Sequence, residues 1–224
     1  MSTDIPALAD SLRIDGPDDG QTVVLAHGAG APMDNPFMTH FASGLAAAGH
    51  RVVRFEFPYM RLRRATGKKK PPDRAPVLMA TWKEVIDLLG GPEKLIIGGK
   101  SMGGRLASMI ASALETQGNP PLGLACLGYP FHAAGRPEKI RTEHFRDLCV
   151  PSLLLQGSRD TLGSRAVVSD LELPLSVAIH WLEDGDHDFK PRVASGRTLR
   201  ENWDEALRRL VRFVEDRKLE RPGA

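Results

Sequence analysis

The sequence has little cysteine and no long hydrophobic run. Its 224 residues contain only two cysteines, Cys126 and Cys149, both in apolar surroundings. Two such residues exclude a disulfide framework and are expected to be buried thiols in a reducing compartment. Every apolar run is far shorter than the roughly 20 residues that cross a bilayer. The sequence therefore excludes a disulfide-stapled secreted domain and predicts no association with membranes.

Neither sign of charge is in excess. The 30 Lys and Arg residues offset 28 Asp and Glu residues to a formal net charge of +2, so the whole-molecule field favours no class of partner. Residues 1–6 contain an acid and lack the basic start and apolar stretch of a signal peptide. We expect a cytoplasmic protein, and the length fits a single domain, residues 1–224.

Short apolar runs alternate with amphipathic stretches along the chain. The runs typical of strands are residues 22–26, 51–55, 94–97, 122–127, 152–156 and 176–181. Helical patterns cover residues 36–48, 75–89, 102–115, 136–147, 164–171 and about 198–217. This alternation predicts an α/β fold with a mostly parallel central sheet and helices on both faces.

The segments of unusual composition each follow one of these strands. They are residues 27–30, 59–70, 99–103, 129–132, 157–160 and 183–188. In an open parallel sheet, ligands bind beyond the carboxyl ends of the strands. We therefore expect the chemistry of this protein at that one edge.

One of these segments, Gly99-Lys100-Ser101-Met102-Gly103, has the pattern G-x-S-x-G. An apolar run precedes it and a helical pattern follows, which is the strand–turn–helix context of a nucleophile elbow. Gly99-Lys100-Ser101 also resembles the end of a phosphate-binding loop, but that motif needs a glycine where Lys94 stands. The pattern therefore favours a nucleophilic serine over nucleotide binding.

A nucleophilic serine needs a base and a group that orients the base. Hydrolases with this elbow supply them in the order Ser, Asp or Glu, His, which Ser101, Asp160 and His187 satisfy. We expect Ser101 to attack a carbonyl carbon, His187 to carry the proton, and Asp160 to orient the imidazole. Asp170 is a weaker alternative to Asp160. The carboxylates next to His187 in sequence are interpreted as loop or cap residues: Asp184, Asp186 and Asp188.

The oxyanion formed by that attack needs two hydrogen-bond donors. The backbone N–H of Met102, which follows the serine, is the first. The second is expected from the glycine-rich first loop, with the N–H of Ala29 as the simplest choice and that of Gly30 as the alternative. Losing one such donor costs on the order of 2.7–4 kcal/mol of transition-state stabilisation.

Further residues of the strand-end loops are candidates for the pocket wall. They are His27, Gly30, Tyr129 and His132, although His132 is equally well interpreted as a structural histidine. The other histidines have no mutual metal-ligand spacing: His40, His50, His144 and His180. We expect neither a metal nor a cofactor.

Residues 59–70 carry a basic run with two open interpretations. It is either a solvated, mobile loop or a segment that overhangs the pocket and attracts an anionic substrate or partner. Few aromatic residues interrupt it and no recognised nucleic-acid-binding module is present, so we expect no nucleic-acid partner.

The chain resembles the small uncapped predicted hydrolases of the alpha/beta-hydrolase superfamily, near its dienelactone-hydrolase-like branch. The matching motifs are residues 27–31, 34–38, 69–74, 99–104, 128–132, 156–160 and 185–190. The resemblance implies an eight-strand-type sheet trimmed at its N-terminal edge, a Ser-Asp-His triad and a minimal or absent cap. Dienelactone hydrolases have a cysteine nucleophile where this chain has Ser101. Related eukaryotic members include testis-expressed proteins and a subunit of a chromatin-associated non-specific-lethal complex.

Two functional hypotheses follow. The first is a serine hydrolase that cleaves a small ester or thioester through an acyl-enzyme; only one short helix, residues 136–147, is available as a lid. The second is a hydrolase-fold interaction module with little or no catalysis, which uses the basic run for docking. The complete triad favours the first, and the oligomeric state stays open.

Overall fold

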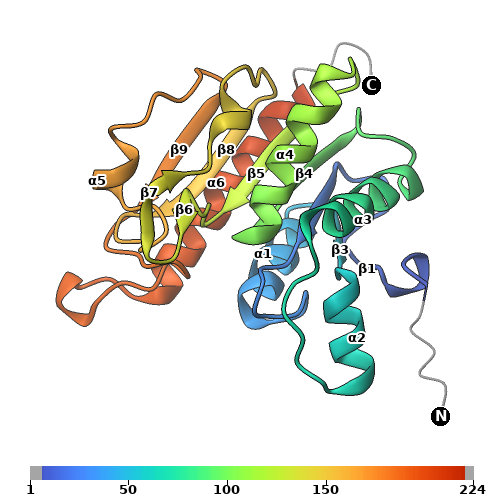
Figure 1. Ribbon diagram of the computed structural model, residues 1–224, viewed down its shortest axis with the longest axis horizontal. Coiled ribbons are helices and arrows are strands. Elements are labelled where there is room, and N and C mark those ends of the chain that lie inside the picture. The colour runs from blue at the N-terminus through green and yellow to red at the C-terminus, as the bar shows by residue number, and fades with distance from the viewer. Residues whose placement is uncertain (1–6, 220–224) are drawn as a thin grey trace.

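The computed structural model describes residues 7–219 and places a seven-stranded sheet at the centre of the molecule (Figure 1). Across the sheet, the strands are β1 (Arg13–Asp15), β3 (Arg51–Phe55), β2 (Thr22–Ala26), β4 (Leu95–Lys100), β5 (Gly123–Leu127), β8 (Ser152–Gly157) and β9 (Val177–Leu182). Neighbouring strands are parallel except for β1, which pairs antiparallel with β3. The predicted fold class, a mostly parallel α/β sheet, is confirmed.

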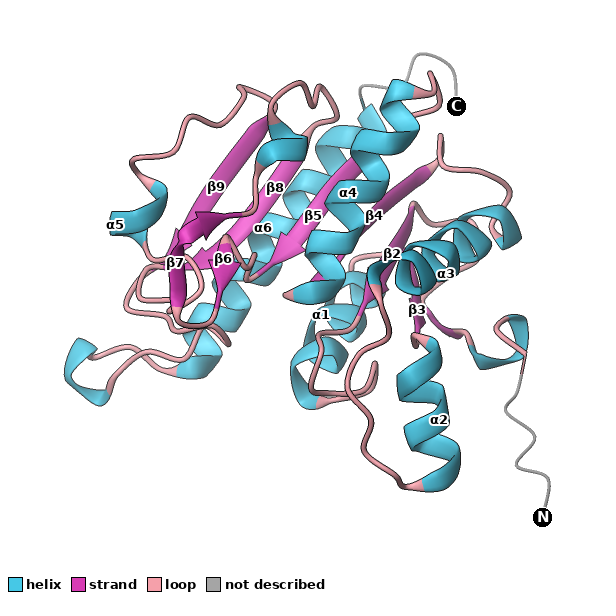
Figure 2. Ribbon diagram, in the orientation of Figure 1, coloured by secondary structure: helices cyan, strands magenta, loops and turns pink. Residues whose placement is uncertain are grey.

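Helices cover both faces of the sheet (Figure 2). α3 (Ala75–Leu88) and α4 (Met102–Thr116) lie on one face, and α1 (Pro36–Ala47) and α6 (Leu199–Leu219) lie on the other. Alternate residues of each strand serve the two cores: in β2, Val24 packs with the cluster under α3 and α4, and Leu25 packs with the cluster under α1 and α6. Because both faces are covered, the central strands β4, β5 and β8 are buried at every residue rather than alternating between buried and exposed positions.

The described residues also form two short helices and three 3-10 turns. They are α2 (Pro58–Thr66), α5 (Arg165–Val168), η1 (Ala9–Ser11), η2 (Glu143–Phe145) and η3 (Val193–Ser195). No helix among residues 7–219 is long and apolar enough to cross a membrane. The segment on which the signal-peptide expectation rests, residues 1–6, lies outside the described residues.

The helix predicted for residues 136–147 is wrong. β7 (Arg136–Ile140) pairs there with β6 (His132–Ala133) as a small antiparallel hairpin, and η2 follows. The sequence 136–147 has only two large apolar residues, Ile140 and Phe145, which do not make a helical stripe. A helix there would bury little surface, whereas the hairpin pairs its main-chain groups.

The basic run of residues 59–70 is not a loop throughout, because its first part forms α2. Pro58 occupies the first turn of the helix, and Gly67 ends it in the left-handed conformation with φ of 70°. Tyr59 and Met60 are buried beneath the charged residues. The sequence did not predict this buried pair, because most of the residues that follow it in the run are charged.

The expected burial of both cysteines is half wrong. Cys126 is fully buried in β5, but Cys149 is exposed just before β8, where its N–H donates to the Glu115 carboxylate at 2.8 Å. The structure also adds β1, whose three residues are too short to give a periodic pattern.

We expect Gly98→Ala to destabilise the sheet. Gly98 lies opposite Ala125 of β5, and a Cβ on Gly98 would lie 1.9 Å from the Ala125 carbonyl oxygen. The strands must separate, so the free energy of unfolding should fall by at least about 1–3 kcal/mol in a urea titration. Gly30→Ala is the control, because a Cβ there meets nothing within 4 Å. Equal stabilities of the two variants would contradict this account.

Candidate active site

Ser101 stands at the sharp turn between β4 and α4. Its backbone is left-handed, with φ of 51° and ψ of −116°, a strained conformation for a residue with a side chain. The flanking glycines permit the turn: a Cβ on Gly99 would lie 2.2 Å from the Ala26 carbonyl oxygen, and one on Gly103 would lie 2.5 Å from it. The elbow is therefore pressed against β2, and the Ser101 hydroxyl is left clear of the sheet.

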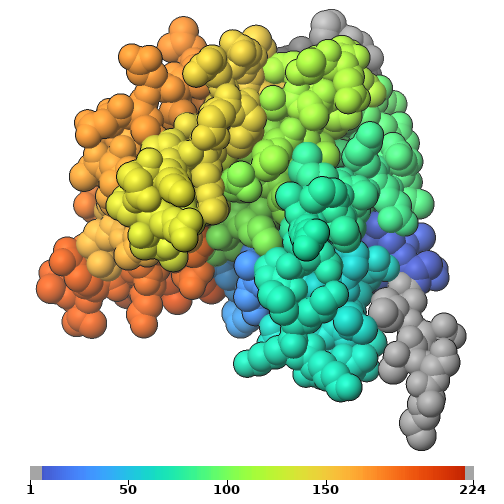
Figure 3. Space-filling view, viewed as in Figure 1, coloured from blue at the N-terminus to red at the C-terminus, as the bar shows by residue number. Residues whose placement is uncertain are grey.

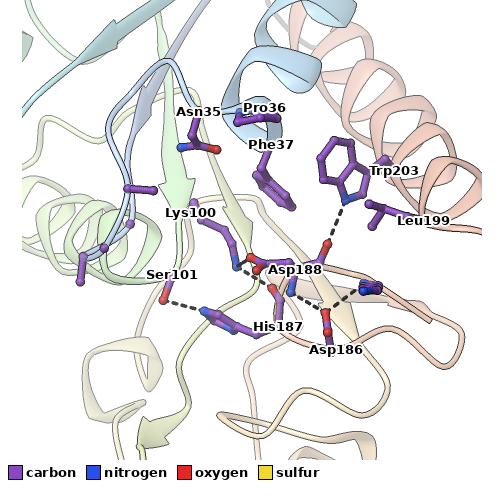
Figure 4. Close-up of a pocket in the computed structure, with 15 residues that line it drawn as sticks. Asn35, Pro36, Phe37, Lys100, Ser101, Asp186, His187, Asp188, Leu199 and Trp203 are labelled. Carbon is purple, nitrogen blue, oxygen red and sulfur yellow. Dashed lines mark hydrogen bonds and ion pairs between the residues drawn. The ribbon is translucent and has the colours of Figure 1, made fainter. Parts of the chain in front are cut away.

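Ser101, His187 and Asp160 form one hydrogen-bonded chain. His187 Nε2 lies 2.9 Å from Ser101 Oγ (Figure 4). On the other side of the ring, His187 Nδ1 lies 2.8 Å from Asp160 Oδ2. With Nδ1 protonated, the ring donates to the carboxylate and Nε2 accepts from the hydroxyl. The three side chains come from loops after β4, β8 and β9, so the parallel sheet brings together residues that are far apart in sequence.

Asp160 is fully buried and held at both oxygens. Its Oδ2 accepts from the Gln156 side-chain amide at 2.9 Å, and its Oδ1 accepts from the N–H of Leu162 at 2.8 Å. Gln156 also accepts from the N–H of Tyr129 at 2.7 Å, which ties the carboxylate to the end of β5. The alternative acid, Asp170, is exposed beyond α5.

The acids around His187 support its loop. Asp186 Oδ1 accepts from the N–H groups of Asp188 and Lys190 at 2.8 and 2.9 Å, which closes the turn. Asp184 pairs with Arg192, and the hydrogen bonds from Arg192 lower the pKa of Asp184 to about 2. Asp188 pairs with Lys100 at 3.1 Å.

The first loop presents its N–H groups to the site because its carbonyls are held from the other side. His27 Nε2 accepts from the N–H of Phe57, so its Nδ1–H donates to the Gly28 carbonyl at 2.6 Å. Burial lowers the pKa of His27, which keeps this ring neutral. The Tyr59 hydroxyl donates to the Ala29 carbonyl at 3.0 Å. Since C=O and N–H point oppositely in a trans peptide, the N–H groups of Ala29 and Gly30 face away from these partners.

α2 braces the same loop through its arginines. Arg63 donates to the Gly30 carbonyl at 3.1 Å. Arg64 pairs with the buried Glu56 carboxylate at 2.6 Å and with Asp34 at 2.9 Å, and its hydrogen bonds lower the pKa of Asp34. Part of the basic run therefore holds the loop in place. Lys68 and Lys69, which are exposed, follow α2, and the segment around α2 forms a projection at the lower edge of the molecule (Figure 3).

A cavity of about 630 Å³ opens at Ser101 and His187. Of the four candidate wall residues, Gly30 lines it, whereas His27 is buried beneath the loop. Tyr129 is buried with its hydroxyl donating to the Arg141 carbonyl, and His132 lies in β6 beside the Ala133 carbonyl. The rest of the wall includes Ala29, Phe37, Lys100, Asp188, Leu199 and Trp203 (Figure 4).

Sequence reasoning assigned no role to Tyr59, Gln156, Phe37 or Trp203, although Phe37 and Gln156 lie within the motifs 34–38 and 156–160. Lys100 could have been predicted as a residue of the site from the sequence, because it occupies the second position of the G-x-S-x-G pattern. Among residues 7–219, no three His, Cys, Asp or Glu side chains are grouped so as to hold a metal ion.

A family profile described as an alpha/beta hydrolase domain matches residues 19–215. The chain therefore belongs to the alpha/beta-hydrolase family. Its structural neighbours are serine hydrolases and related enzymes, including dienelactone hydrolase. The similarity to these neighbours is one of fold, since the three solved structures described next are each under 25% identical to this chain.

The three solved structures resemble this chain over most of their length. An alpha-beta serine hydrolase homologue from Coxiella burnetii is 21% identical, with a TM-score of 0.61 over 89% of this chain and 90% of the other. A serine hydrolase without a lid from Xanthomonas campestris is 23% identical, with a TM-score of 0.58 over 89% and 88%. A dienelactone hydrolase from Anabaena variabilis is 19% identical, with a TM-score of 0.63 over 88% of each chain.

We expect Gln156→Leu to destabilise the fold, because it leaves the Asp160 carboxylate and the main chain of Tyr129 without their buried partner. Each unpaired buried group costs about 1–3 kcal/mol, which guanidinium unfolding would measure. Gln117→Leu, at the exposed end of α4, makes the same chemical change and should be nearly neutral. A similar decrease in the free energy of unfolding in both variants would show that the Gln156 contacts do not account for the destabilisation.

Proposed function

We propose that this protein is a serine hydrolase that cleaves a small ester or thioester through the triad Ser101, His187 and Asp160. The observation that carries the proposal is the continuous chain of hydrogen bonds, 2.9 Å and 2.8 Å long, at the mouth of the cavity. A nucleophile, a base and an orienting carboxylate in this order are what acyl transfer requires. The hydrolase fold of the family is in keeping with it.

In the acylation step, Ser101 Oγ bonds to the carbonyl carbon while His187 Nε2 takes the hydroxyl proton. The electron pair of the C=O bond moves onto oxygen, and the buried Asp160 stabilises the imidazolium that forms. Collapse of the tetrahedral intermediate expels the alcohol or thiol, which leaves with the proton from His187. Water then repeats the sequence on the acyl-enzyme, releases the acid and restores Ser101.

The oxyanion in both steps would be bound by the N–H of Met102 and that of Ala29, with Gly30 as the alternative donor. Met102 begins α4, where the first N–H groups have no partner within the helix. The N–H of Ala29 makes no hydrogen bond to another main-chain group of the described residues. Both donors are set before substrate arrives, which is the arrangement that electrostatic preorganisation favours.

The proposed substrate is small because little covers the site. The segment between β5 and β8 forms the β6–β7 hairpin and η2, so too few residues remain there to form a lid domain. The charged side chains along the cavity balance in sign: Lys100, Lys190, Asp186 and Asp188. This balance favours a neutral acyl group over the anionic substrate that the basic run suggested. The interaction-module hypothesis is less favoured, since a docking scaffold has no need of an ordered triad.

We expect Ser101→Ala to abolish labelling by a fluorophosphonate probe and to lower the turnover of p-nitrophenyl acetate at least about 10⁴-fold. Both effects follow from loss of the attacking oxygen. Ser108→Ala is a matched control, since Ser108 Oγ also contacts a histidine, His144, at 2.7 Å but is buried inside α4. It should label and turn over normally. Full turnover by the Ser101 variant would rule out the proposal.

We expect Tyr59→Phe to slow turnover about tenfold, because the Gly28 and Ala29 carbonyls lose the hydroxyl that contacts them. These two peptides carry the N–H groups of Ala29 and Gly30, the proposed oxyanion donors, which become less fixed. The decrease should fall on kcat rather than KM in steady-state assays with p-nitrophenyl acetate. Tyr129→Phe removes another buried hydroxyl, whose partner is the Arg141 carbonyl, and should leave kcat unchanged. Equal kcat values for Tyr59→Phe and the wild type would contradict the role given to this hydroxyl.

A further inference from the structure

Lys100 places an ammonium group in the wall of the cavity, next to the proposed nucleophile in sequence. The residue is only 8% exposed, and the rings of Phe37 and Phe189 lie 5.1 and 5.9 Å from its Nζ. Burial lowers the pKa of Lys100, an effect that the Asp188 carboxylate opposes. A charged group in such surroundings is costly unless specific partners hold it, so its partners indicate what it does.

The first of those partners is the main chain of His187. Lys100 Nζ donates to the His187 carbonyl oxygen at 2.5 Å, and it lies 3.1 Å from Asp188 Oδ1 (Figure 4). The two contacts fall on successive residues of the loop after β9. A lysine at the end of β4 is thus connected to the backbone of the residue whose imidazole contacts Ser101.

The end of β5 leaves space for this contact. Gly128 is left-handed, with φ of 66°, and a Cβ on it would lie 2.9 Å from the His187 carbonyl oxygen and 3.0 Å from Lys100 Nζ. Any larger residue at this position would press on both ends of the hydrogen bond. The absence of a side chain at Gly128 therefore lets three separate segments meet at one point.

Two side chains of α6 also support the loop, at carbonyls that follow that of His187. Trp203 Nε1 donates to the Asp188 carbonyl at 2.9 Å, and Asn202 donates to the Phe189 carbonyl at 2.8 Å. Both belong to α6. Lys100 instead holds the carbonyl of His187 itself and belongs to the strand that carries Ser101, so it connects the two residues between which the proton would move.

We propose that Lys100 is a positioning residue, which fixes the His187 imidazole relative to Ser101 by binding the His187 carbonyl and the Asp188 carboxylate. The inference rests on the proposed function for its effect on rate. Lys100 does not contact the reacting atoms. A different role for the same ammonium, recognition of an anionic substrate, predicts an effect confined to substrates that carry a carboxylate.

The test is Lys100→Met, assayed with p-nitrophenyl acetate and with the mono-p-nitrophenyl ester of glutaric acid. A misplacement of reacting groups costs up to about 100-fold in rate, so kcat should fall about 10- to 100-fold on both esters. KM should stay within about twofold, since substrate binding is not touched. Lys94→Met is the matched control, because Lys94 is exposed directly before β4, at the edge of the sheet away from the cavity; it should keep the wild-type kcat.

A second variant and a second measurement keep the inference open to refutation. Lys100→Gln keeps a polar group in the cavity wall if Lys100→Met fails to fold, and its kcat should also fall. The low-field proton resonance of the His187 Nδ1–H, assigned by its loss in His187→Gln, should shift or broaden in either Lys100 variant and not in Lys94→Met.

A wild-type kcat in a folded Lys100 variant, an unchanged His187 resonance, or a loss seen only with the glutarate ester would each overturn the inference. The resonance is read without substrate. A wild-type protein that neither labels nor turns over ester would therefore refute the proposed function, while the NMR measurement would still decide whether Lys100 positions His187.

Discussion

The close approach of the Ser101 turn to β2 is the constraint on which the site depends. Gly99 and Gly103 let the turn come within contact distance of the Ala26 main chain, and this contact sets the height of the Ser101 hydroxyl above the sheet. The first loop begins at His27, directly after Ala26, so the same contact sets the distance between Ser101 and the N–H groups of that loop. The distance between Ser101 and the first loop, which both line the cavity, therefore depends on this backbone contact.

The periodic features of the sequence predicted most of the fold. Buried strands are recognisable in the sequence as apolar runs. Parallel strands have their carboxyl ends at one edge of the sheet, which is why the sequence predicts that Ser101, Asp160 and His187 lie close together. Their hydrogen bonds could not be derived in this way. Gln156 and Tyr59 act through contacts that no local pattern encodes, and residues 136–147 have no buried stripe to decide between helix and hairpin.

The basic run illustrates how charge can serve as internal framework. From the sequence alone, the arginines of this run predict a surface that is exposed to solvent or that binds an anionic ligand. In the fold, Arg64 compensates the buried Glu56 carboxylate, and Arg63 holds the Gly30 carbonyl. Pairs of this kind are costly to break, because removing one partner leaves the other charge or carbonyl unsatisfied. The lysines that follow α2 are exposed, as the composition of the run implies.

The supports of the His187 loop also bear on how the protein acquires its chemistry during synthesis. Asn202 and Trp203, which hold the loop carbonyls, lie in the helix that follows the last strand of the sheet. When Ser101 and His187 have already left the ribosome during synthesis, Asn202 and Trp203 have not yet emerged. These two contacts can therefore form only after residue 203 has emerged and α6 has docked, so the His187 loop gains its full support late in synthesis.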